Sequence, residues 1–248
     1  MKKIAVFILI AIIALSFASC DENPVLEEIQ TYDVIGEIHS LDIRINAADF
    51  VIVAAEGFSV ESNLKYLSVS EKNGVLSIID KANFATNYGG AELTITVPEN
   101  TAFDDVSISV GAAKLVSTAI SADTVKLNLG AGDVSFSCLN AASSIEIGGG
   151  AGEITVADGV LNNLVLDMGV GEFNLTAALL GECDLKFGVG QSDLILLGGK
   201  DSYTVDIEKG VGNITLDGVD VTDFDNGDGE NHIKIEGGIG TINIEFRN

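Results

Sequence analysis

The chain has 248 residues, with 37 Asp and Glu against 13 Lys and Arg, and a formal net charge of −24 at pH 7. A surface with this charge repels nucleic acid and anionic lipid and favours cations or basic partners, although solubility alone accounts for most such surfaces. The chain has no Trp and only two His, so sugar-stacking aromatics and the commonest acid–base side chain of enzymes are scarce.

The first nineteen residues predict an export signal. Two lysines precede an uninterrupted apolar run over residues 4–15, which is too short to span a membrane comfortably. Two small residues then precede Cys20, and this ending resembles a bacterial lipoprotein signal, in which the cysteine becomes the lipidated first residue of the mature chain. We therefore expect a lipoprotein-type signal peptide over 1–19, lipid attachment at Cys20, and an exported protein held at the bacterial membrane or cell surface. An ordinary cleaved signal, with Cys20 as a stray thiol, is the alternative.

The next segments predict a short tether and the start of one repeat domain. Residues 20–34 are polar and are interpreted as the tether, and residues 35–248 as a single domain. Two apolar alternations flank a corner at residues 46–49, which predicts a strand on each side. Two more flank residues 71–74, which end in Asn-Gly and therefore predict a hairpin turn.

A turn of small residues, usually Gly-x-Gly, then recurs along the chain. The first five gaps between successive turns are 19, 20, 19, 19 and 22 residues, and the turns begin at Gly111, Gly130, Gly150, Gly169, Gly188, Gly210 and Gly238. Apolar residues alternate with polar ones before and after each turn, which is the period of a half-buried strand. The repeat predicts an all-β fold, a single-stranded β-helix or β-solenoid whose coils have about 19–20 residues and at least two strands each. Since a strand rather than a helix follows every turn, no dinucleotide cofactor is expected.

Four inward-facing side chains are predicted from the same alternation. Phe136 and Phe173 are expected to fill equal positions of the core. Cys138 shares parity with Phe136, and Cys183 shares parity with neighbouring apolar residues, so both are expected to be buried. They lie on different corners and more than one coil apart, which predicts two free thiols rather than a disulfide.

Two groups of carboxylates are candidate cation sites. Asp133, Glu153 and Glu172 each follow a corner glycine by three residues and are expected to stack on one outer face. Such a column could recruit a divalent cation, or relax into solvent with nearby lysines as counter-charges.

The second group lies in the longest interval between turns, and an EF-hand register fails there because Gly and Asp stand in the wrong order. We interpret it as a solvated, flexible insertion, so that deleting residues 220–229 should barely change the melting temperature, with an irregular calcium site as the alternative. Its acidic residues are Asp217, Asp220, Asp223, Asp225, Asp228 and Glu230.

The segment 93–98, which ends in Val-Pro, and the strand that leads to Gly111, together with the later Gly-x-Gly turns, resemble the bacterial putative-adhesin family of β-strand-repeat proteins, whose function is uncharacterised. The resemblance covers about residues 36–247. It implies a right-handed β-solenoid on exported or membrane-anchored proteins, and it supplies no catalytic residues.

Three functional hypotheses follow. The first is a surface lipoprotein whose solenoid serves adhesion, structure or ligand binding, with a protein or glycan partner outside the cytoplasm. The second is a divalent-cation-binding envelope protein. The third, which the scarcity of His and Trp disfavours, is a polysaccharide-active β-helix enzyme. No catalytic residue, metal ligand or cofactor is assigned. A binding solenoid should expose a contiguous apolar or aromatic strip, whereas a spacer should not.

Overall fold

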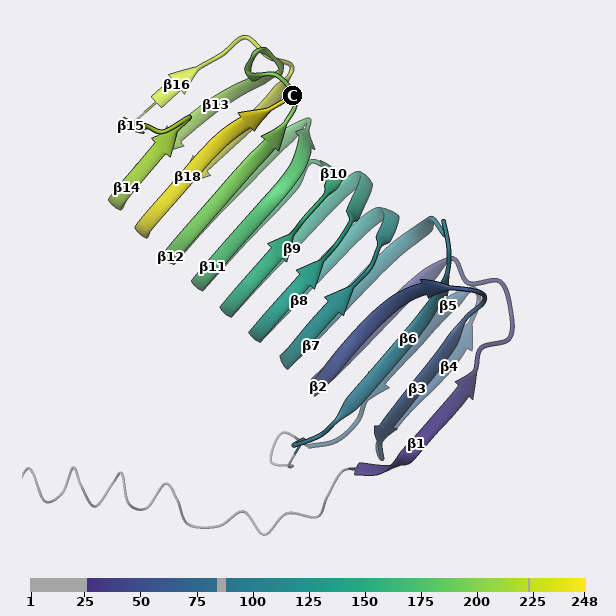
Figure 1. Ribbon diagram of the computed structural model, residues 1–248. Helices are drawn as coiled ribbons and strands as arrows, with labels where there is room; N and C mark the ends of the chain where they lie inside the picture. The colour runs from purple at the N-terminus through teal and green to yellow at the C-terminus, as the bar shows by residue number, and fades with distance from the viewer. Residues whose placement is uncertain (1–25, 84–87, 223) are drawn as a thin grey trace, which may run out of the picture.

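The computed structural model describes residues 26–83, 88–222 and 224–248, and within them the fold is all-β (Figure 1). The strands form a single hydrogen-bonded sheet, and one short 3-10 helix, η1 (Lys200–Ser202), accompanies them. In chain order the strands are β1 (Leu26–Asp33), β2 (Ser40–Ala55), β3 (Ser59–Leu64), β4 (Leu67–Lys72), β5 (Val75–Asp80), β6 (Glu92–Pro98), β7 (Phe103–Ser117), β8 (Ile120–Phe136), β9 (Leu139–Val156), β10 (Gly159–Asn162), β11 (Leu164–Leu180), β12 (Glu182–Leu197), β13 (Tyr203–Glu208), β14 (Val211–Leu216), β15 (Val219–Val221), β16 (Phe224–Asn226), β17 (Asn231–Glu236) and β18 (Ile239–Arg247).

The middle of the molecule is a stack of parallel coils. β7, β8, β9, β11 and β12 pair in that order, and the paired residues occupy equivalent places of the repeat, as Val106 and Val125 do. Each strand continues through its glycine corner, so one bent strand makes most of a coil where the sequence predicted at least two. Alternate side chains point inward and build the core, which confirms an open, solenoid-like all-β fold.

The order of the coils in space differs from their order in the sequence at the C-terminal end. β12 pairs with β17 and β18, and these pair in turn with β13 and β14. The last coil of the sequence, β17 and β18, therefore lies between β12 and the coil formed by β13 and β14. Figure 1 shows β18 inserted between β12 and β14. All these pairs are parallel and keep the register of the glycine corners, as in Gly190↔Gly240 and Gly212↔Gly240.

The N-terminal end has the same exchange of order. β2 pairs with β7 on one side and with β5 and β6 on the other, so the first coil of the sequence is the second in space. Ile43 lies between Ile78 and Ile108, and Ile52 pairs with Ile95. All five of these isoleucines are buried in one continuous core.

Antiparallel strands cap both ends of the stack. β4 pairs with β5, β3 with β6, and β1 with β3 at one end, while β16 pairs with β13 and β15 with β14 at the other. Such caps cover the backbone edges on which another chain would otherwise add a strand. β1 begins at Leu26, inside the stretch that the sequence assigned to a tether.

The interpretation of the acidic insertion as a flexible loop is wrong, because it contains the two capping strands β15 and β16. Its solvated character is confirmed, since Asp217, Asp220, Asp228 and Glu230 are exposed. Val219 pairs with Leu216, and the Thr204 hydroxyl donates a 2.9 Å hydrogen bond to the Gly229 carbonyl. A Cβ on Gly229 would overlap the backbone of Ser202 and Tyr203, so the returning chain is packed closely against the end coil. Deleting this cap would expose an edge, which removes the basis for expecting an unchanged melting temperature.

The hairpin predicted at residues 71–74 is confirmed. Lys72 pairs with Val75 across a two-residue turn, in which Asn73 and Gly74 have φ values of 54° and 76°. Two consecutive positive φ values are what a type I′ turn needs, and Asn-Gly is its preferred sequence.

The core confirms both phenylalanines as buried, since each is 0% exposed, but not as equivalents. Phe136 pairs with Val156, whereas Phe173 pairs with Ile154, so the two rings lie in neighbouring columns two residues apart. The expectation of equal positions is therefore wrong, because Phe136 follows Gly130 by six residues whereas Phe173 follows Gly169 by only four.

The two cysteines are free thiols, as predicted, but only Cys183 is buried. Burial raises the pKa of the Cys183 thiol, because the thiolate would lose its hydration. Cys138 is only partly buried, since β8 ends at Phe136 and the alternation on which its inward orientation was based ends with the strand.

Candidate functional site

The glycine corners fix the backbone so closely that side chains are excluded there. Gly171, Gly190, Gly240 and Gly212 have φ values of 139°, 151°, 147° and 154°, a region that side chains rarely adopt. They pair in that spatial order, and a Cβ on Gly190 would overlap the carbonyl oxygen of Gly171 in the next coil. The corner therefore presents bare backbone on each side of the middle residue of every Gly-x-Gly turn.

Those middle residues form an exposed apolar column, which we call the ridge: Val170, Val189, Ile239 and Val211. Val170 pairs with Val189, Val189 with Ile239, and Ile239 with Val211, so the four side chains are contiguous across four coils. They are 54%, 46%, 57% and 72% exposed in that order. Toward the N-terminus the same column continues in alanines, at Ala151, Ala131, Ala112 and Ala47.

A charged face leads into the ridge. Lys234 forms ion pairs with Glu236 at 2.8 Å and with Glu208 at 3.3 Å, and Lys186 lies 3.8 Å from Glu236 and 3.9 Å from Asp184. The hydrogen bonds that Lys234 donates to Glu236 and Glu208 raise the pKa of Lys234 above its usual range, and the first of them lowers the pKa of Glu236. Lys186 and Lys234 are thus each shared between two carboxylates.

A polar face leaves the ridge on its other side, and its two columns nearest the ridge contain no basic side chain. Asn243 Nδ2 donates a 2.7 Å hydrogen bond to Asp193 Oδ1, and Gln191 Nε2 donates one of 2.8 Å to Asp193 Oδ2. Thr215 Oγ1 donates to Asn243 Oδ1 at 2.9 Å, which extends the ladder to the end coil. These bonds hold the side chains of neighbouring coils in register beside the ridge.

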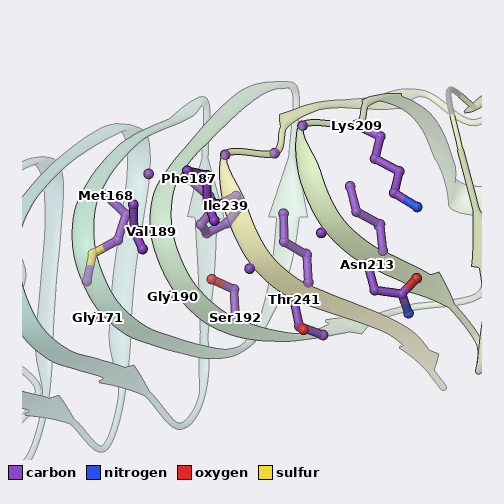
Figure 2. Close-up of a pocket in the computed structure, with 18 residues that line it drawn as sticks. Met168, Gly171, Phe187, Val189, Gly190, Ser192, Lys209, Asn213, Ile239 and Thr241 are labelled. Carbon is purple, nitrogen blue, oxygen red and sulfur yellow. The ribbon is translucent and has the colours of Figure 1, made fainter.

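A narrow recess lies beneath the corner, under the ridge (Figure 2). Its wall includes Met168, Phe187 and Ser192, and it exists because the inward position between Phe187 and Lys209 is occupied by Gly237, which has no side chain. About 20 Å³ is open to the centre of a water molecule, which is room for an ordered water rather than an organic ligand. The recess is therefore a packing gap, and the ridge above it is the candidate binding surface.

An open trough of about 690 Å³ along the preceding corners contains the residue types that an enzyme of sugar chains would need. Arg44, Glu146 and Asp167 line it, but they stand on β2, β9 and β11, with β7 and β8 between the first two. Arg44 is held by Asp42 at 3.0 Å, and Glu146 by Lys126 at 2.7 Å. The arginine therefore does not converge with the two carboxylates in this trough.

The predicted stacking of Asp133, Glu153 and Glu172 in one column is confirmed. Asp133 pairs with Glu153, and Glu153 with Glu172. Neutral donors rather than lysines offset the central carboxylate: Thr155 Oγ1 and Asn174 Nδ2 each donate a 3.1 Å hydrogen bond to Glu153 Oε1. Across residues 26–83, 88–222 and 224–248, no group of three His, Cys, Asp or Glu is arranged to hold a metal ion.

The acidic residues of the last interval serve the cap where they are described. Asp217 accepts a 3.1 Å hydrogen bond from the Phe246 amide and lies 3.9 Å from Lys200, and Asp220 accepts one of 2.9 Å from Asn213. The backbone of Asp225 pairs with Asp206, while Asp228 and Glu230 are exposed. Asp223 lies outside the described residues, as does Cys20.

The ridge residues can be identified from the sequence, but the sequence does not show that their side chains lie next to one another. The middle residue of each Gly-x-Gly turn is easily found, yet the coil order places Ile239 between Val189 and Val211, and this order appears only in the structure. The strip is apolar, one of the two kinds expected of a binding solenoid, and it is aliphatic rather than aromatic.

Comparison with known proteins identifies relatives of the fold. No curated protein matches the chain. Among solved structures, it is similar to a putative cell adhesion protein from Clostridium sporogenes ATCC 15579, at 14% identity over 89% of this chain and 99% of that one, with a TM-score of 0.39. It is also similar to a putative adhesin from Parabacteroides merdae ATCC 43184, at 13% identity over 92% and 100% of the two chains, with a TM-score of 0.38.

Within the described residues, no helix has the length and apolar character needed to cross a membrane.

One family model matches residues 37–233, which is most of the repeat domain and includes the corners from Gly111 to Gly210. This match confirms the resemblance to bacterial β-strand-repeat proteins, and the chain belongs to the Toastrack DUF4097 family.

Proposed function

We propose that this chain is an exported, lipid-anchored solenoid without enzymatic activity, and that it binds a partner outside the cytoplasm through the ridge. The leader that ends at Cys20 supports export and anchoring. Pairs such as Leu166↔Leu185 support coils of about 19–20 residues, which we propose wind with a right hand.

The observation that carries the binding role is the ridge itself. Val170, Val189, Ile239 and Val211 expose about half or more of their surface in one unbroken column. Stability does not require them, because the same column is alanine in the other coils. A contiguous apolar patch with polar surroundings is typical of interaction surfaces, and a mere spacer needs none.

The position of the ridge fits an adhesive role. The proposed anchor precedes β1, which caps one end of the stack, whereas the ridge lies on the coils toward the other end (Figure 1). About four coils of alanine corners separate the two, at about 4.8 Å per coil. An anchor at Cys20 would therefore precede the end of the stack that lies farther from the ridge.

Threonine at the four ridge positions should abolish binding without unfolding the protein. Threonine keeps the branched shape of valine and suits exposed strand positions, but its hydroxyl removes the apolar character. The measurement is the signal of the mature chain on an array of glycans and matrix proteins, with melting temperature as the check on folding. The matched control replaces Val116 and Val160, which are 39% and 41% exposed and lie on β7 and β10 rather than on the ridge strands, with threonine.

Two results would contradict the proposal. One is a ridge variant that keeps every array signal of the wild type. The other is a control variant that loses the same signals as the ridge variant, which would make the effect one of general surface hydrophobicity.

Replacing Cys20 with alanine should release the protein from membranes, because the lipid would have no site of attachment. The measurement is the distribution of the protein between membrane and soluble fractions, together with metabolic labelling by a fatty-acid analogue. A wild-type chain that takes up no label would remove the anchor from the proposal.

A further inference from the structure

We propose that the partner of the ridge is a cationic amphipathic helix that lies along the solenoid axis. The inference rests on the proposed function and specifies the class of partner that the ridge accepts. Three properties of the described residues support it: the spacing of the ridge, the bare backbone beside it, and the charge of the two faces that border it.

The spacing of the ridge matches a helix better than a strand. Its four side chains stand on adjacent coils about 4.8 Å apart, so the column measures about 14 Å from first to last. Three turns of an α-helix rise about 16 Å, and one apolar side chain per turn would meet each ridge residue with a total mismatch of about 2 Å. Same-face side chains of an extended strand are about 6.8 Å apart and would fall out of step by about 6 Å.

The glycine columns on both sides of the ridge leave room for such a helix. Gly188 and Gly190 flank Val189, and Gly238 and Gly240 flank Ile239, so no side chain stands next to either apolar residue along its own strand. A helix can therefore lie on the ridge and place its flanking side chains against the two faces that border it, which we call the shoulders. Long basic side chains suit this position, since they pack their apolar stems on the ridge and extend their charges beyond it.

The charge of the bordering faces selects a basic partner. On the face that leaves the ridge, the two columns nearest to it contain Glu172 and Asp193 and no Lys or Arg. On the face that leads to it, Lys209 stands just before the corner of the end coil. The corresponding columns contain two more lysines against five carboxylates: Asp167, Asp184, Asp206, Glu208 and Glu236. Lys186 and Lys234 are each paired with two of these carboxylates, so the net field over both shoulders is negative.

The same charges exclude a second copy of this chain as the stable occupant. Two ridges placed face to face would bring acidic shoulders against each other, and like charges across an interface oppose association. Four partly exposed aliphatic side chains also offer far less than the roughly 800 Å² per partner of a standard interface. A helix needs less area when its charges complement the shoulders.

The test uses designed peptides of about 18 residues, which is five helical turns. One has a stripe of leucines, one per turn, flanked by lysines. The second has glutamates in place of the lysines, and the third is the basic peptide with a central proline that breaks the helix. Affinity for the mature chain, with Cys20→Ser to remove the anchor, is measured by fluorescence anisotropy at about 20 mM and about 500 mM salt.

The basic helix should bind at least tenfold more tightly than the acidic or the proline peptide, and its affinity should fall at high salt. Threonine at the four ridge positions should weaken it at least tenfold, while threonine at Val116 and Val160 should leave it unchanged. Glu172→Gln with Asp193→Asn should weaken binding at low salt and reduce its salt dependence, with the ridge intact.

Equal affinity for the basic and acidic helices would overturn the partner class, as would equal affinity for the unbroken and the proline peptide. If the array signals of the wild type still depended on the ridge, the proposed function would stand with another kind of partner. If the ridge variant kept both the array signals and the affinity for the basic peptide, the proposed binding function of the ridge and the proposed partner class would both be wrong.

Discussion

Gly190→Ala should destabilise the solenoid by more than about 4 kcal/mol, a large part of the roughly 5–15 kcal/mol that stabilises an ordinary domain. Gly190 has a φ of 151°, and an added Cβ would overlap the carbonyl oxygen of Gly171 in the adjacent coil. The obstacle is backbone that is itself hydrogen-bonded in the parallel stack, so it cannot move aside without separating two coils. The measurement is denaturant unfolding followed by far-ultraviolet circular dichroism.

Gly57→Ala is the matched control, because it separates backbone strain from contact. Gly57 also has a positive φ, 75°, but a Cβ added there would meet no atom within 4 Å. The free energy of unfolding of the Gly57→Ala variant should fall by about 1–2 kcal/mol, the cost of the left-handed conformation alone. If the two variants lost the same stability, close contact between the glycine columns would not be what holds the coils together.

The strands and the corners were predictable because their signals are local. Apolar residues that alternate with a period of two identify the inward side chains of a strand, whichever coils lie beside it. A glycine such as Gly171 or Gly190 indicates a bend from its residue type alone. The acidic column of Asp133, Glu153 and Glu172 was predictable for the same reason, since equal spacing from a corner fixes equal positions in successive coils.

The order of the coils was not predictable, because coils with the same pattern and length can stack on one another in any order. The strand from Ile239 fits between Val189 and Val211 as well as it would fit at the end of the stack. Only the lengths of the last intervals, 22 and 28 residues, indicate that the chain leaves the simple repeat. The ridge depends on this order, so its contiguity could not be derived before the structure.

The C-terminal cap was missed for a different reason, whereas the β4–β5 hairpin of the other cap was predicted. Residues 217–229 are rich in Asp and Gly, which are depleted in strands, and composition therefore favours a loop. An edge strand at the end of a stack is exposed on one side and needs few apolar residues, and charged residues there protect the edge. In the cap, Asp217 and Asp220 accept hydrogen bonds from Phe246 and Asn213, which composition alone does not reveal.

Phe173→Ala should destabilise the protein by about 3–5 kcal/mol, the usual cost of deleting a fully buried aromatic ring. The ring is 0% exposed, lies between Ile154 and Ser192 in the column of its position, and stands 6.1 Å from the ring of Phe187. Ser192 is too small to fill the space that alanine would leave, so the cavity would persist between two coils. The measurement is the free energy of unfolding in urea, at constant m-value.

Phe173→Leu is the control for this prediction, because leucine retains most of the lost volume and should cost less than about 1.5 kcal/mol. The new cavity in the alanine variant would adjoin the recess that Phe187 and Ser192 line beneath the corner. Neighbouring coils should therefore loosen first on this side, and amide exchange in β11 and β12 should quicken before that in β7 and β8. A Phe173→Ala protein that unfolds within about 1 kcal/mol of the wild type would contradict the inward orientation of this strand and the register of the coils around it.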